Sequence, residues 1–79
     1  MTIAETIYNE YNSLPCEENG FYGEGWYKLI KKARNEAVNE EEESPESYDS
    51  SLILTFKDGS TVYVGNPKQY CYDGFIRLQ

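Results

Sequence analysis

The residues of this chain that could take part in chemistry are mostly carboxylates and phenols. The sequence holds fourteen acidic side chains against seven basic ones, eight tyrosines, two cysteines and no histidine. General acid–base catalysis usually recruits histidine, and a nucleophilic serine or cysteine needs a base beside it. Without histidine, Cys16 and Cys71 lack their commonest activating partner. We therefore expect no enzymatic activity.

Metal and cofactor chemistry also lacks a recognisable set of ligands. Two cysteines without a histidine fall short of a structural zinc site. The segments Asp58-Gly59-Ser60 and Asp73-Gly74 have the composition of turns but not the spacing of an EF-hand calcium loop. A catalytic carboxylate pair needs a deep cleft, which a domain of this size does not offer. We expect no metal, no cofactor and two reduced thiols.

The acidic residues are concentrated in one segment. Six of the fourteen fall within ten residues, namely Glu40, Glu41, Glu42, Glu43, Glu46 and Asp49. One interpretation is a solvated linker that keeps a small protein soluble. The other is mimicry of nucleic acid, because carboxylates on alternate residues of an extended segment stand about 6.8 Å apart, close to the phosphate spacing along one strand. In that interpretation Glu40, Glu42 and Glu46 occupy a Lys/Arg groove of a partner.

The aromatic residues divide into two groups. Those on or beside the apolar stripes of the expected helices are explained by core packing, namely Tyr8, Tyr11, Trp26 and Tyr27. The others fall in expected loops or on the less aliphatic face of a strand, namely Phe21, Tyr22, Tyr48, Tyr63, Tyr70 and Tyr72. Aromatic side chains are enriched at binding hot spots. We therefore take Tyr22, Tyr63 and Tyr72, together with the six clustered acids, as candidate partner contacts.

The net charge of −7 bears on the choice of partner. Direct binding of nucleic acid or anionic lipid is disfavoured, because each phosphate contact normally requires a Lys or Arg. The basic stripe Lys28, Lys31 and Lys32 is explained as a solvated helix face with Glu24–Lys28 and Lys32–Glu36 pairs. The expected partner is a basic protein surface. With no basic leader and no long apolar run, a cytoplasmic location without a membrane is expected.

The N-terminal half, residues 1–39, is predicted to be helical within a single domain. Thr2 and Glu5 have the spacing of a capping box, which starts a helix that Pro15 ends. Its apolar stripe is Ile3, Ile7, Tyr11 and Leu14. A second helix is predicted from about Gly25 to Asn39, with Trp26, Leu29, Ile30, Ala33 and Ala37 on one face. The glutamates that follow oppose the helix dipole, so an acidic linker over residues 40–50 is expected.

The C-terminal half, residues 51–79, is predicted to form a hairpin and a third strand. Asp58-Gly59 between two apolar runs is a strong hairpin signal. A three-residue loop with Gly59 in the left-handed conformation pairs Leu54 with Val62 and Leu52 with Val64, which gives one apolar face. The third strand combines residues 70–72 and 75–78, interrupted at Asp73-Gly74.

The predicted fold class is therefore α+β, with two N-terminal helices packed on a three-stranded antiparallel sheet. The side chains expected to form its core come from the second helix and from both strands of the hairpin. They are Trp26, Leu29, Ile30, Leu52, Leu54, Val62 and Val64.

A very small, acidic, histidine-free and tyrosine-rich chain resembles anti-CRISPR proteins and other DNA mimics, with which phages and mobile elements disable host nucleases. The resemblance is one of size and composition over the whole chain, and no site residues carry over because those proteins share no common fold. It implies a stoichiometric, non-enzymatic inhibitor of a CRISPR surveillance complex or effector nuclease. The alternative is a small acidic protein-interaction or regulatory module unrelated to nucleic-acid systems.

Overall fold

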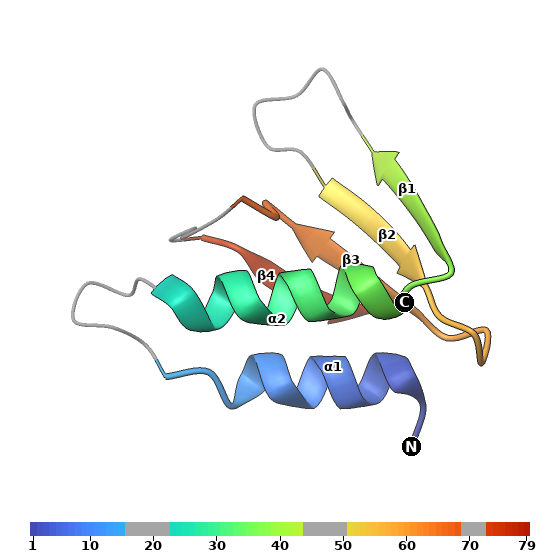
Figure 1. Cartoon of the computed structure of the whole chain (residues 1–79), viewed down its shortest axis with the longest axis horizontal. Helices are drawn as coiled ribbons and strands as arrows, with labels where there is room; N and C mark the ends of the chain where they lie inside the picture. Colours follow the sequence, from blue (N-terminus) through green and yellow to red (C-terminus); the bar gives the residue numbers. More distant parts are fainter. Residues whose placement is uncertain (16–22, 44–50, 69–72) are drawn as a thin grey trace.

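The described part of the chain folds into two helices and a four-stranded antiparallel sheet (Figure 1). The computed structural model describes residues 1–15, 23–43, 51–68 and 73–79. The elements are α1 (Ile3–Asn12), α2 (Gly23–Glu36), β1 (Asn39–Glu43), β2 (Ser51–Thr55), β3 (Thr61–Gly65) and β4 (Phe75–Leu78). The strands lie in the order β1-β2-β3-β4. The predicted α+β class is confirmed, but the sheet has four strands and not three.

The additional strand, β1, lies in the segment that was predicted to be an acidic linker. It pairs antiparallel with β2 from Asn39↔Thr55 to Glu43↔Ser51, and all five of its side chains are exposed. Glutamate is depleted in strands, so its local preference does not predict this pairing. The backbone hydrogen bonds offered by β2 override that preference. The linker prediction is thus corrected for residues 40–43, while residues 44–50 lie outside the described chain.

The capping box predicted at the start of α1 is confirmed. The Glu5 backbone N–H donates to Thr2 Oγ1 at 3.0 Å, and the Thr2 N–H donates to Glu5 Oε1 at 2.9 Å. The helix ends at Asn12, before Pro15, with Ser13 as its C-cap. Helix α2 runs from Gly23 to Glu36 and stops short of the predicted end, because Asn39 already belongs to β1. No helix in the described part of the chain is long and apolar enough to cross a membrane.

The predicted hairpin register is confirmed. Leu54 pairs with Val62 and Leu52 with Val64, and Gly59 has a positive φ of 84°. All seven predicted core residues are at most 6% exposed. The same buried cluster also includes residues of both helices, of β4 and of the β2–β3 connection, namely Ala4, Ile7, Ala33, Ile76 and Phe56. Residues of both helices and of one face of the sheet therefore belong to a single core.

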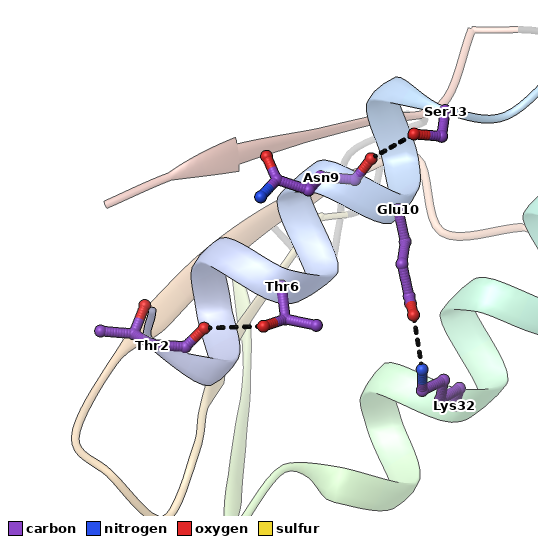
Figure 2. A network of polar contacts seen from close by, with 6 residues as sticks. All are labelled: Thr2, Thr6, Asn9, Glu10, Ser13 and Lys32. Carbon is purple, nitrogen blue, oxygen red and sulfur yellow. Dashed lines mark hydrogen bonds and ion pairs between the residues drawn. The ribbon is translucent and has the colours of Figure 1, made fainter.

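Two lysines of α2 form ion pairs with glutamates of the helices. Lys28 Nζ lies 3.4 Å from Glu24 Oε1, as predicted. Lys32 instead reaches α1, where its Nζ lies 2.6 Å from Glu10 Oε1 (Figure 2). The predicted Lys32–Glu36 pair is therefore wrong, because packing of the two helices brings Glu10 within reach. The hydrogen bond to Glu10 raises the pKa of Lys32.

The N-terminus of α1 is docked on the turn between β2 and β3. The Ile3 N–H donates to Asp58 Oδ2 at 2.9 Å, and the Ala4 N–H donates to Ser60 Oγ at 3.1 Å. These are two of the N–H groups that a helix cannot satisfy internally. Asp58 also accepts a hydrogen bond from the Ser60 hydroxyl. The Ser60 side chain, followed by the backbone N–H groups of Ile3 and Ser60, lowers the pKa of Asp58.

The lowered pKa of Asp58 predicts a pH-dependent contribution to stability. A carboxyl whose pKa is depressed by folding stabilises the protein above its unfolded pKa of about 3.9, and that contribution is lost as pH falls through the folded pKa. Asp58→Asn should unfold at a lower temperature than the parent at neutral pH. The gap between their thermal midpoints should narrow as pH falls below about 4. A difference in thermal midpoint that stays constant with pH would contradict an ionic role for Asp58. Glu24→Gln, at an exposed ion pair, serves as the control.

Candidate protein-binding face

The sheet face opposite the core forms the candidate site. Side chains alternate between the faces of a strand, so the confirmed register assigns each residue to one face. The open face, as we call it, carries Asn39, Glu41, Glu43, Ser51, Ile53, Thr55, Thr61, Tyr63, Gly65, Phe75 and Arg77. Of these residues Ser51 and Gly65, at one end of the sheet, are buried, and the strand residues of the hydrophobic core all lie on the opposite face.

An aromatic cluster, defined as Tyr63, Phe75 and Arg77, lies on the half of the open face formed by β3 and β4. The rings of Tyr63 and Phe75 are stacked with their centroids 5.9 Å apart, and the Arg77 guanidinium lies 4.4 Å from the Tyr63 centroid. The Phe75 ring rests directly on Gly65, where a Cβ atom would come within 2.2 Å of it. Phe75 remains 39% exposed. The cluster is thus held in place by its own contacts and still offers surface to a partner.

The acidic strand and the aromatic cluster meet on this face. The register aligns Glu41 with Ile53, Ile53 with Tyr63, and Tyr63 with Arg77 in one row across the sheet. Neighbouring strands lie about 4.8 Å apart, so the backbones at Glu41 and Tyr63 are separated by about 10 Å. The structure therefore brings together two groups of residues that the sequence predicted separately. A single partner surface of ordinary size spans both.

The four glutamates of β1 are not equivalent. Glu40 accepts two hydrogen bonds from Arg34 of α2, at 2.7 Å to Nε and 2.8 Å to Nη2. This contact raises the pKa of Arg34, and the charge of Glu42 adds to the effect. Glu41 and Glu43 alternate to the open face, where alternate residues of a strand stand about 6.8 Å apart. Glu41 and Glu43 are thus the two carboxylates of β1 that share a face with Ile53 and Tyr63.

Of the predicted trio of Glu40, Glu42 and Glu46, the first two alternate to the side of β1 opposite Glu41 and Glu43. Glu40 joins the sheet edge to α2 and is not a free carboxylate. The remaining predicted contacts lie outside the described residues, namely Glu46, Asp49, Tyr22 and Tyr72, as do both cysteines. Tyr63 is half-buried on the face predicted for it. Among the described residues, no group of His, Cys, Asp or Glu side chains is arranged to hold a metal ion.

Sequence reasoning missed Phe75 and Arg77 as parts of the site. The available signal was the alternation in β4, where Ile76 is buried and its two neighbours are exposed. Placing both beside Tyr63 also required the pairing of β4 with β3, which the Asp58-Gly59 hairpin does not determine.

Comparisons of the chain with protein-family models, with curated proteins and with solved structures find no match. Function is therefore inferred from the open face alone. That face combines carboxylates, stacked aromatic rings and one guanidinium. Tyr and Arg are among the residue types enriched at the energetic hot spots of protein interfaces, which makes this face a candidate for protein contact.

Proposed function

We propose that the protein is a non-enzymatic inhibitor that binds a basic surface of a nucleic-acid-handling host defence complex, as anti-CRISPR proteins do. It would act in the cytoplasm of the host cell. The observation that carries the proposal is the shared face of Glu41, Glu43 and Tyr63. Carboxylates beside a prearranged aromatic cluster fit a protein surface that is basic and partly apolar.

Charge and strand geometry support binding to a partner surface that normally receives nucleic acid. The net charge of −7 steers the protein toward a positive surface and accelerates its capture. The open-face carboxylates of β1 have a separation of about 6.8 Å, which is close to that of phosphates along one strand. Inhibition would then follow from occupying the groove that receives target DNA.

One observation favours the alternative, a protein-interaction module unrelated to nucleic-acid systems. Arg77 lies in the middle of the aromatic cluster, 4.4 Å from the Tyr63 ring centroid. A mimic of nucleic acid gains nothing from a cation at that position, because its target surface is basic. A partner surface of mixed charge would instead bind the Arg77 guanidinium through its own acidic groups.

The proposal is tested by capture followed by inhibition. The tagged protein is incubated with a lysate of a CRISPR-bearing bacterium, and bound proteins are identified by mass spectrometry. A recovered effector complex is then purified and titrated with the protein in a DNA-cleavage assay. We expect cleavage to be lost at about one equivalent, and Tyr63→Ala to restore it. Recovery of metabolic or structural proteins only would support the alternative module, and so would unchanged cleavage by a recovered effector complex.

A further inference from the structure

A groove of about 400 Å³ lies between α2 and the segment that follows β3, away from the open face. It is lined by Tyr27, Ile30, Lys31, Arg34 and Asn35 of α2 and by Pro67-Lys68. Its volume falls within the range of small-molecule sites, roughly 300–1,000 Å³. The groove is therefore large enough for a compact organic ligand, whereas the open face is suited to a protein.

The described side chains that line this groove are basic or uncharged. Three of the seven basic side chains line it, and none of its described lining residues is acidic. Lys31 forms no ion pair within the described chain, in contrast to Lys28 and Lys32 on the same helix. Arg34 holds Glu40 through Nε and Nη2, which leaves its Nη1 hydrogens without an acceptor among the described residues. The groove thus offers donors and positive charge to an anion.

The apolar lining is placed beside these cations. Tyr27 is 36% exposed, and its ring centroid lies 6.0 Å from Lys31 Nζ. Ile30 and Pro67 contribute aliphatic surface. A flat ring in a ligand can pack on Tyr27 while an attached anionic group reaches Lys31. This combination suits a ligand with a ring at one end and a negative charge at the other.

We propose that this groove binds a small organic anion in which a phosphate or carboxylate is attached to a flat ring. The ring packs against Tyr27 and Pro67, and the anionic group accepts hydrogen bonds from Lys31 and Arg34. This site is separate from the open face and does not rest on the inhibitor proposal.

The proposal is tested with four probes added to the isotope-labelled full chain and followed by amide chemical shifts. Adenosine monophosphate and benzoate carry both a ring and an anion, adenosine carries the ring alone, and inorganic phosphate carries the anion alone. We expect at least one of the first two probes to shift amides of α2 and of residues 67–68 with a submillimolar Kd. Adenosine and inorganic phosphate should bind at least tenfold more weakly. Absence of shifts in these amides with all four probes up to 10 mM would overturn the proposal.

A matched pair of variants tests the role of Lys31. Lys31→Gln should weaken binding of the better probe at least fivefold, whereas Lys28→Gln, one turn earlier and outside the groove, should change it less than twofold. Equal weakening by both variants would show a general charge effect and contradict a site at Lys31. Tyr63→Ala on the open face should leave probe binding unchanged, so failure of this proposal is distinguishable from failure of the inhibitor proposal.

Discussion

Replacing Trp26 by alanine is expected to unfold most of the protein at room temperature. The side chain is fully buried, its Nε1–H donates to the Lys68 carbonyl at 3.0 Å, and its ring packs edge-on against Tyr11. Removing a buried tryptophan costs about 3–5 kcal/mol. A single core in a domain of this size supplies about that much net stability. The expected result is loss of the cooperative thermal transition, measured by circular dichroism.

Two neighbouring substitutions serve as controls for this prediction. Tyr27→Ala, at an exposed position next in sequence, should retain a cooperative transition. Trp26→Phe keeps an aromatic ring but removes the donor to Lys68, so it should give an intermediate loss of about 1–3 kcal/mol. If Trp26→Ala melts at the same temperature as the parent, the ring is not a core residue.

The largest expected effect on partner binding comes from Tyr63→Ala. Tyr63 joins Phe75 and Arg77 in one cluster, so its removal also frees the two side chains that stack on it. Interface hot spots cost about 2 kcal/mol or more when truncated, which corresponds to a Kd about thirtyfold weaker. The measurement is titration of the captured partner at two salt concentrations. The effect should appear mainly in the dissociation rate.

The carboxylates are tested in parallel by the double variant Glu41→Gln and Glu43→Gln. It should slow association and flatten the salt dependence of binding, because it removes charge from the open face. Glu40→Gln is the matched control, since this residue is engaged by Arg34. If the double variant binds as well as the parent while Tyr63→Ala loses binding, the contact is purely aromatic. Unchanged binding in both would exclude the open face.

The hairpin was predictable from sequence, whereas the edge strand was not. The Asp58-Gly59 turn and the alternation around Leu54 and Val62 are local features that agree with the final fold. The glutamates of β1 have the opposite local preference, and only the hydrogen bonds from β2 and the contact between Glu40 and Arg34 make them a strand. These contacts are made with residues outside the segment, so the sequence of the segment does not predict a strand.

The candidate site, too, was predictable from sequence only in part. The position of Tyr63 follows from the period of two in its own strand, so the sequence predicts its face. The positions of Phe75 and Arg77 beside Tyr63 depend on the pairing of β4 with β3, two strands that are separated by nine residues of sequence, 66–74. The docking of α1 on Asp58 and Ser60 likewise joins residues more than fifty positions apart. A local sequence pattern predicts neither the pairing of β4 with β3 nor the docking of α1.

The position of β1 at the edge of the sheet also bears on self-association. An edge strand carries unpaired backbone groups that can template pairing with a second copy. Two β1 strands brought side by side would set glutamate against glutamate, and like charges directly opposite are destabilising. The acidic run therefore protects the edge at neutral pH, whatever else it binds. Protonating these carboxylates, or replacing all four by glutamine, removes that protection and opens a route to edge-to-edge aggregation.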